Sequence, residues 1–493
     1  MARSFSGASP ANPHIRELDV PPDVLRRLAA LHPSRYPVLF DSAADGPLSR
    51  TSILVAEPRA SLWLDSSGRV GAEGITPRGA DFLTALENWW LAERLPANTG
   101  GPADRKSGHA GRQSGPADRK SGRPQLPFAG GWAVFLSYEA AQEIEPRLRL
   151  PGSSLPWRAF ALRTPCALVH ERATGKVFAI AEGAAADSLE RLEADARSVA
   201  GFSESMADSL DVESVIEEDP AAYLGRVVRA KEYVRAGDIY QANLSRPWRV
   251  KLAREPDIGS LYNRLCKANP APFAALAQWR GTTILSSSPE RLVRIADGHI
   301  DTRPIAGTRP RSRRPGDDLA EMRELAAHPK ERAEHIMLID LERNDLGRVS
   351  EPGSVRVDEL MTIESYAHVH HIVSNVSGRL RADVTPIGAL RAVFPGGTIT
   401  GVPKFRCMQI IAELEGTGRG AYTGSLGFLG RDGTMDMNIL IRTLSVQGHR
   451  VELRAGGGIV ADSDPQRELD ETRAKARGML AAFAVTQPAG ALA

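Results

Sequence analysis

Short turns between apolar runs constrain the fold of this 493-residue chain more than any other feature of its sequence. Asp297-Gly298 follows the apolar run 292–295, and Asp432-Gly433 separates the runs 424–429 and 435–445. Asp-Gly turns connect antiparallel strands, whereas parallel strands need a long crossover. The pattern predicts an α+β fold of large antiparallel sheets packed with helices. Further strands are expected at residues 38–42, 52–56, 132–138, 240–248, 283–287 and 451–455.

Changes in composition divide the chain. Residues 97–126 are polar and repeat the octapeptide GPADRKSG, which predicts a disordered insertion because two polar copies cannot form a solenoid. Residues 201–218 are acidic and form a connector that ends at Asp219-Pro220, a helix cap followed by proline at the first helical position. We therefore predict an N-terminal domain over 14–200 and a C-terminal domain over 219–486.

Overall charge and cysteine content exclude several classes of protein. Lys and Arg total 62 against 60 Asp and Glu, so the net charge of +2 creates no field for nucleic acid or an anionic membrane. An apolar export signal is absent near Met1, and no run of 18 apolar residues follows. The three cysteines are too widely spaced for a metal knuckle and odd in number. A reducing cytoplasm is the expected location.

Two predicted helices each carry a pair of glutamates three residues apart. The helix 328–344 contains Glu331 and Glu334, and the helix 464–483 contains Glu468 and Glu471. Residues at this spacing share one face of a helix. Oxygen ligands suit Mg²⁺, but the same pattern also describes a solvated face, on which Lys475 would pair with Glu471. The residues alone leave both interpretations open.

Glycine-rich segments form a second candidate feature. Residues 394–404 precede a helix that begins near Pro403, and residues 455–460 follow an apolar strand. Backbone amides in either segment could face an anion, because glycine permits a close approach. Neither segment has the spacing of a phosphate-binding loop or a dinucleotide fingerprint. A turn without a ligand is the alternative for both.

Polar residues on apolar strands form a third candidate feature. Parity places Asp436, Asn438 and Arg442 on one face of a strand over 435–445. A buried arginine needs a carboxylate or an anionic ligand. Glu290 follows another apolar strand, and His370 and His371 lie in an apolar run, where ordinary solvated or core roles are the alternative.

Together these segments resemble the chorismate-utilising enzymes, a family that includes anthranilate synthase component I, aminodeoxychorismate synthase component I, and isochorismate and salicylate synthases. The resemblance covers residues 222–483 and, more loosely, 39–42 and 127–139. It implies the anthranilate synthase component I-like fold, with a C-terminal domain that binds chorismate.

The resemblance also implies roles for individual residues. Glu334 and Glu471 would hold Mg²⁺ with support from Glu331 and Glu468, and Glu290 would protonate the leaving 4-hydroxyl of chorismate. The remaining implied contacts are to the substrate carboxylates and ring: Arg442, Tyr422, Gly457, Gly458, Lys475, Thr398, His371 and Lys404. Ser42 marks a candidate tryptophan pocket, which is regulatory in some relatives and structural in others.

The attacking nucleophile is expected to be ammonia. Gln241 occupies the position at which the water-adding relatives have lysine, and glutamine cannot deprotonate water. Asn243, Arg291 and Gly396 look like residues of aminodeoxychorismate synthase, whereas Ala306 replaces the lysine nucleophile of many such enzymes. The motifs favour an Mg-dependent aminodeoxychorismate synthase component I of 4-aminobenzoate and folate biosynthesis. The alternative is anthranilate synthase component I of tryptophan biosynthesis.

Ammonia must come from another subunit. Cys166, Cys266 and Cys407 do not lie in a glycine-flanked nucleophile turn, so a glutamine amidotransferase partner is implied. A rival hypothesis is a non-catalytic module that senses tryptophan or binds RNA through the arginines of 309–314. That arginine run lacks aromatic residues between its charges, which favours a solvated loop.

Overall fold

The computed structural model describes residues 4–5, 13–44, 46, 48–96, 126–201, 210–311, 314–365 and 369–483. The predicted insertion lies outside the described residues, apart from Leu126. Residues 202–209 of the predicted connector also lie outside them, and its described end contains strand β11 (Val212–Glu217).

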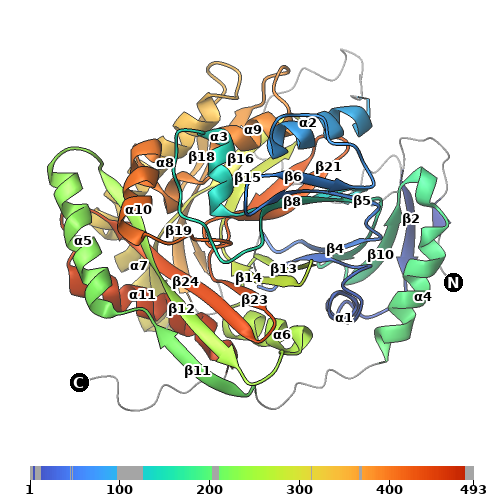
Figure 1. Cartoon of the computed structure of the whole chain (residues 1–493), viewed down its shortest axis with the longest axis horizontal. Coiled ribbons are helices and arrows are strands. Elements are labelled where there is room, and N and C mark those ends of the chain that lie inside the picture. Colours follow the sequence, from blue (N-terminus) through green and yellow to red (C-terminus); the bar gives the residue numbers. More distant parts are fainter. Residues whose placement is uncertain are drawn as a thin grey trace.

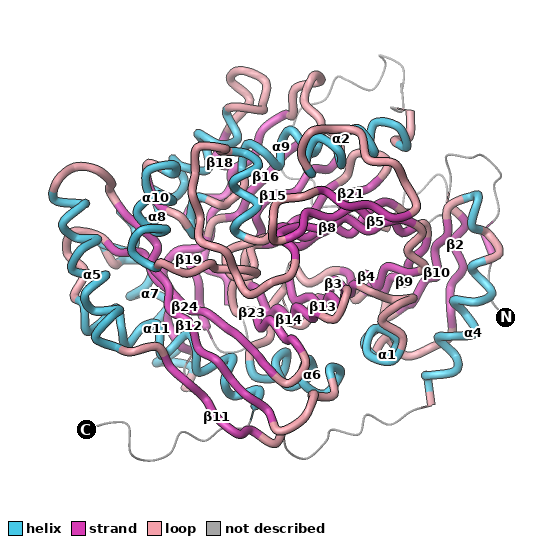
Figure 2. The backbone as a smooth tube through the Cα atoms, in the orientation of Figure 1, coloured by secondary structure: helices cyan, strands magenta, loops and turns pink. Residues whose placement is uncertain are grey.

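Two antiparallel sheets form the centre of the molecule, as the turns predict (Figure 2). The first sheet has the order β1 (Ser4–Phe5), β2 (His14–Leu18), β10 (Lys176–Ala181), β9 (Cys166–Glu171), β4 (Thr51–Ala56), β3 (Val38–Asp41), β13 (Phe273–Trp279), β14 (Thr282–Ser288), β23 (Thr443–Gln447), β24 (Arg450–Ile459), β12 (Gln241–Leu252) and β11, with β20 (Gly401–Val402) beside β12.

The second sheet has the order β17 (Ile305–Pro310), β19 (Val369–Arg379), β16 (His299–Arg303), β15 (Arg291–Ala296), β22 (Met435–Asn438), β21 (Ser425–Gly430), β7 (Gly131–Leu136), β8 (Trp157–Thr164), β5 (Ala60–Asp65) and β6 (Val70–Glu73), with β18 (Arg356–Ser365) beside β19. Asp297 and Gly298 join β15 to β16 with φ values of 53° and 73°. Two positive φ values are typical of a type I′ turn, so the predicted hairpin is confirmed.

The two sheets pack face to face around a shared apolar core. Along β4, Ile53 and Val55 contribute to the core between the sheets, while Leu54 and Ala56 point to the outer side of the first sheet. This alternation follows from the two-residue period of a strand. Apolar residues on both faces explain why the strand reads as a nearly continuous hydrophobic run.

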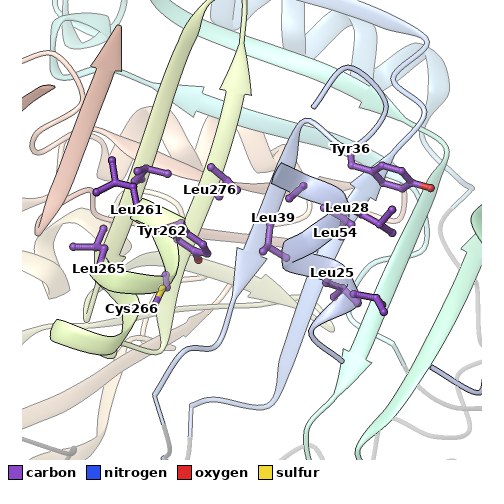
Figure 3. Packing of buried hydrophobic residues seen from close by; sticks show 14 of the residues in the cluster. Leu25, Leu28, Tyr36, Leu39, Leu54, Leu261, Tyr262, Leu265, Cys266 and Leu276 are labelled. Atoms are coloured by element: carbon purple, nitrogen blue, oxygen red, sulfur yellow. The ribbon is translucent and has the colours of Figure 1, made fainter. Parts of the chain in front are cut away.

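Helices cover the outer faces of the sheets (Figure 1). On the first sheet, Leu25 and Leu28 of α1 (Val24–Leu31) and Leu261 and Leu265 of α6 (Ile258–Ala268) pack in one cluster with Leu39 of β3 (Figure 3). The other helices near this sheet are α4 (Ser188–Ala200), α5 (Pro220–Arg235), α10 (Lys404–Glu415) and α11 (Pro465–Leu480).

The second sheet is covered by α2 (Phe82–Glu93), α8 (Pro329–Gly347) and α9 (Pro386–Val393), and α7 (Pro315–Ala327) contacts β17 and β19. The short elements are α3 (Ala141–Ile144) and the 3₁₀ turns η2 (Tyr138–Ala140), η3 (Gly183–Ala185), η4 (Gly397–Ile399) and η5 (Ala481–Phe483). Asp219 caps α5 and Asp464 caps α11 by accepting a backbone N–H, as predicted.

Each sheet contains strands from both predicted domains. Asp41 of β3 pairs with Ala274 of β13, and Leu136 of β7 pairs with Ser425 of β21. The division at residues 201–218 therefore separates segments of sequence that share both sheets. Among the described residues, no helix is long and apolar enough to cross a membrane.

The strand predicted over 435–445 is wrong. β22 ends at Asn438 in the second sheet and β23 begins at Thr443 in the first, so the chain crosses between the sheets. Arg442 has a φ of 54°, which is outside the extended region, and face parity no longer applies beyond Asn438. Asp436 instead binds Arg291 with both carboxylate oxygens.

Candidate functional site

A buried carboxyl group lies where β14 leaves the first sheet. Glu290 is 5% exposed, and the Thr398 hydroxyl donates a hydrogen bond to its Oε1 at 2.8 Å. Burial raises the pKa of Glu290 to about 7, against the opposing effects of Thr398 and the Lys475 charge. A carboxyl group with this pKa retains its proton in a large share of molecules at neutral pH. It can therefore act as a general acid.

A guanidinium without a carboxylate partner belongs to the segment beside β14, because the Arg442 carbonyl accepts a hydrogen bond from the Ser287 N–H at 3.0 Å. Arg442 donates to Asn269 Oδ1 at 3.0 Å, and among the described residues no carboxylate forms an ion pair with it. Burial lowers the pKa of Arg442. Asn269 is itself fixed, because its amide donates to the Ser287 carbonyl at 3.1 Å. The arrangement fits an anionic ligand, since a buried cation without a counter-charge is costly.

Tyr422 and His371 are both placed near this guanidinium. The charge of Arg442 contributes to the pKa of each group, while burial raises the pKa of Tyr422 to about 12 and lowers that of His371 to about 4. His371 is therefore neutral at physiological pH. The neighbouring His370 has the ordinary core role that was the alternative prediction. Its ring contacts Ser365 Oγ at 2.7 Å and Asp318 Oδ1 at 3.0 Å.

The glycines at 456–458 lie within β24, where a loop with free amides was expected. They pair with residues 243–245 of β12, so one edge of β24 is hydrogen-bonded, whereas pairing with β23 on the other edge extends only to Leu453. A methyl group added to Gly458 would lie 2.0 Å from Gln241 Nε2, and one added to Gly456 would lie 2.8 Å from the Tyr422 hydroxyl. Gly456 is required, because a methyl group there would also lie 2.4 Å from the Leu244 carbonyl oxygen, whereas a methyl group on Gly458 would displace the flexible Gln241 amide.

The opposite face of β24 carries the α11 carboxylates. A methyl group on Gly457 would lie 3.4 Å from Glu468 and 3.5 Å from Glu471. Lys475 pairs with Glu471 at 2.6 Å, as the i+4 spacing predicts, and also donates to the Gly456 carbonyl. These contacts bring the two α11 glutamates and Lys475 together at the glycine segment.

The α8 carboxylates have different neighbours. Glu331 pairs with Arg309 at 3.4 Å and would lie 3.0 Å from a methyl group on Gly307, while Glu334 is partly exposed one turn along the helix. Within the described residues, no three Asp, Glu, His or Cys side chains are arranged as a metal site. The donor atoms still match Mg²⁺ chemically, because this ion needs only one or two carboxylates together with substrate and water oxygens.

Lys404 lies in a buried ion pair. Its ammonium donates to Asp345 Oδ2 at 2.5 Å and to the Val393 carbonyl at 3.1 Å. Asp345 was missed by sequence analysis, as was Glu342, which is 3% exposed on the same face of α8. Burial, with the charges of Asp345 and Glu290, raises the pKa of Glu342 well above its ordinary value. The i, i+3 spacing of these acids was the available signal.

The candidate tryptophan segment lies at the end of β3. The Ser42 hydroxyl donates to the Thr51 carbonyl at 2.9 Å, and its amide donates to Ser52 Oγ at 3.2 Å. Asp41 accepts hydrogen bonds from Arg26 and Ser52. These contacts hold the segment, and tryptophan binding stays a prediction.

None of the three cysteines has the environment of a nucleophile. All are buried, and burial raises the pKa of Cys166 to about 11 and that of Cys266 and Cys407 to about 12. The thiolate is the reactive form of cysteine, so these thiols are poorly suited to glutamine hydrolysis.

Comparisons with known proteins agree on the family. A family model described as chorismate binding enzyme matches residues 95–481. A protein named anthranilate synthase component 1 from Streptomyces coelicolor is 43% identical over 376 residues, which cover 72% of this chain and 73% of that protein. Another of that name from Synechocystis is 36% identical over 508 residues, which cover 95% and 94%.

Solved structures give the same result for the fold. The crystal structure of anthranilate synthase component I from Streptococcus pneumoniae has a TM-score of 0.73 and 29% identity, and the match covers 87% of this chain and 92% of that one. The menaquinone-specific isochorismate synthase from Escherichia coli has a TM-score of 0.65 at 18% identity over 97% and 96% of the two chains, a similarity of fold alone.

Proposed function

Because the chain belongs to the chorismate-binding enzyme family, we propose that it is an anthranilate synthase component I that converts chorismate and ammonia to anthranilate, pyruvate and water. Relatives named anthranilate synthase component 1 favour this alternative over the aminodeoxychorismate synthase that the motifs suggested.

Ala306 is the residue on which our choice between amination at C2 and amination at C4 depends. Ala306 lies on β17, is 7% exposed, and pairs with Ile372 next to His371. An alanine methyl cannot attack C2 of chorismate, so a covalent lysine route to C4 is closed to this chain. Direct attack of ammonia on C2 needs no such group, and it leads to anthranilate.

Two of the residues that resemble aminodeoxychorismate synthase have structural roles. Arg291 binds Asp436 at 2.9 and 3.0 Å and stacks over the Phe273 ring. Gly396 leaves room for Ile439, whose Cδ1 would lie 2.9 Å from an added methyl group. Both residues are explained by packing, so they give little support to amination at C4.

The described groups suit the proposed reaction. Arg442 and the Tyr422 hydroxyl would hold a substrate carboxylate, and Glu290 would give its proton to the 4-hydroxyl, which leaves as water. Glu334 and Glu471, supported by Glu331 and Glu468, would hold Mg²⁺. Bound there, the ion would neutralise a substrate carboxylate. Ammonia would come from a glutamine amidotransferase subunit, since the buried thiols offer no glutaminase centre.

Identifying the aminated product of the reaction tests the proposed function. Purified protein incubated with chorismate, Mg²⁺ and ammonium should form fluorescent anthranilate without any added lyase. Formation of 4-aminobenzoate only after addition of a 4-amino-4-deoxychorismate lyase would instead establish the aminodeoxychorismate activity. Ala306→Lys should depress anthranilate formation, because the new amine would compete with ammonia for C2. The control for the added charge is Ala253→Lys, on the exposed turn after β12. A lysine at the buried Ala277 would instead disrupt the core.

A further inference from the structure

Arg419 is a buried arginine that lies between the segments carrying the candidate site. Its side chain is 1% exposed and forms an ion pair with Glu415, the last residue of α10. The guanidinium makes five hydrogen bonds of 3.3 Å or less, two of them to Glu415. An arginine side chain has five N–H donors in a rigid, planar arrangement. The whole donor capacity of Arg419 is therefore used inside the protein.

One of its acceptors belongs to the turn that carries Thr398. Arg419 Nη1 donates to the Ile399 carbonyl at 3.2 Å, and Ile399 is the last residue of η4. The preceding residue, Thr398, donates its hydroxyl hydrogen bond to Glu290 at 2.8 Å. The guanidinium thus fixes the backbone next to the hydroxyl that contacts the candidate acid.

The two remaining acceptors belong to different sheets. Arg419 Nη1 also donates to Thr423 Oγ1 at 3.3 Å, just before β21 of the second sheet, and the guanidinium lies 5.7 Å from the centre of the Tyr422 ring. Arg419 Nη2 donates to the Asn243 carbonyl at 2.6 Å, on β12 of the first sheet, where Asn243 pairs with Gly458. One side chain therefore connects η4, the turn at Tyr422 and the strand beside the glycine segment.

The backbone and the counter-charge of Arg419 are also held in place. Glu139 of η2 is 2% exposed, and its Oε1 accepts the N–H groups of Arg419 at 2.7 Å and of Gly420 at 3.1 Å. Arg454 donates to Glu415 Oε2 at 2.9 Å. A buried polar network with this many satisfied groups is rigid, so the guanidinium has a fixed position from which it can orient its neighbours.

The acceptors distinguish Arg419 from a buried arginine that only stabilises the fold. Arg163 is 7% exposed, pairs with Glu93 at 2.6 Å and Glu182 at 2.7 Å, and lies 5.0 Å from the centre of the Trp132 ring. It matches Arg419 in burial, in its carboxylate partner and in its aromatic contact. Its partners are not residues of the candidate site, which makes it a suitable control.

We propose that Arg419 is a positioning residue that fixes Thr398 and Tyr422 relative to each other. This role rests on the proposed function, because Glu290, which Thr398 contacts, and Tyr422 are groups of the proposed reaction. Lysine cannot take over the role, since one ammonium nitrogen cannot reach the acceptors that three guanidinium nitrogens contact.

Thr398 is the route by which Arg419 would act on the candidate acid. The polar groups that act on Glu290 come from four elements: Thr398 of η4, the Ile305 N–H of β17, Lys475 of α11 and Glu342 of α8. Within the described part of the chain, η4 is the one of these elements that Arg419 hydrogen-bonds. A displaced η4 would therefore change Glu290 through the loss of the Thr398 hydrogen bond.

Arg419→Lys and the matched Arg163→Lys test this role in an assay of chorismate consumption with Mg²⁺ and ammonium, which detects either aminated product. Both variants should lose thermal stability. We expect only Arg419→Lys to move the alkaline limb of the pH profile of kcat/KM for chorismate upward, by up to the shift in Thr398→Val, and to lower kcat/KM below that limb about tenfold. In a Thr398→Val background, Arg419→Lys should move the limb no further, because the hydroxyl that it positions is absent.

A second variant tests the contact at Tyr422 and keeps the buried charges. Thr423→Val preserves the side-chain shape and removes the oxygen that accepts from Arg419. It should raise the KM for chorismate about threefold, the effect of one weakened hydrogen bond, and leave the alkaline limb near pH 7.

The contrary outcomes are distinct. An unmoved limb in folded Arg419→Lys, an equal shift in Arg163→Lys, or a further shift on top of Thr398→Val would overturn the positioning role. If Arg419→Lys does not fold, an unchanged chorismate KM in Thr423→Val overturns it. A wild-type protein that consumes no chorismate would overturn the proposed function, and the positioning role with it.

Discussion

The hydrogen bond between Thr398 and Glu290 gives a prediction whose sign and size follow from the structure. Thr398→Val keeps the side-chain shape and removes the hydroxyl that donates to Glu290 Oε1 at 2.8 Å. That bond stabilises the ionised carboxylate and so lowers the pKa of Glu290. Its loss should raise the pKa.

The expected size comes from two general quantities. A hydrogen bond to a charged group contributes about 1.5–3 kcal/mol, and one pKa unit corresponds to about 1.4 kcal/mol. The pKa of Glu290 should therefore rise from about 7 to roughly 8 or 9. Because the protonated acid is the active form, activity is lost as the pH rises through this pKa.

The assay is the pH profile of kcat/KM for chorismate, with total ammonium adjusted to keep free ammonia constant. The alkaline limb should lie near pH 7 in the wild-type enzyme and move upward in Thr398→Val. Thr400→Val is the matched control, since the Thr400 hydroxyl donates to the Gly396 carbonyl instead, and its alkaline limb should stay near pH 7. A limb that stays in place or moves to lower pH in Thr398→Val would refute Glu290 as the acid.

Three further predictions concern charge and close packing. Glu290→Gln should abolish turnover and raise the free energy of unfolding at pH 8, measured by urea denaturation, by up to about 3 kcal/mol. The reason is that the pKa of Glu290 is about 7 in the fold and about 4.5 in the unfolded chain, so the ionised carboxylate destabilises the fold at pH 8; at pH 4, where the group is protonated in the fold, the gain should vanish. Glu471→Gln should raise the half-saturating Mg²⁺ concentration at least tenfold in activity titrations, with Glu452→Gln unchanged; equal titrations would exclude Glu471 as a ligand. Gly458→Ala should reduce ammonia-dependent kcat/KM more than tenfold with circular dichroism preserved, because its methyl group would lie 2.0 Å from the present position of Gln241 Nε2 and would displace that amide. Full activity would show that turnover does not depend on the position of the Gln241 amide.

Local patterns in the sequence were sufficient to predict the short turns and the helix caps. Asp-Gly turns, helix caps and two-residue periodicity all act over a few neighbouring residues, and the hairpin at Asp297-Gly298 and the caps at Asp219 and Asp464 are confirmed. The buried position of Glu290 also agrees with the role that the family resemblance implied.

Features that depend on contacts between distant segments could not be predicted from the sequence. Face parity assumes a continuous extended chain, and it failed where Arg442 adopts a positive φ and the chain changes sheets. The ion pair between Lys404 and Asp345 depends on how α10 packs near α8. No local pattern specifies that contact, or that Asn269 would hold the Arg442 guanidinium.

The sharing of both sheets by distant segments has a consequence during synthesis on the ribosome. β3 receives its neighbour β13 only after residue 273 has been made, and β7 receives β21 only after residue 425. Until then each strand has one edge open to pairing with other chains, which is a known route to aggregation. A nascent or truncated chain that ends before β13 would therefore depend on chaperones, and separately expressed halves would be expected to fold only when they are made together.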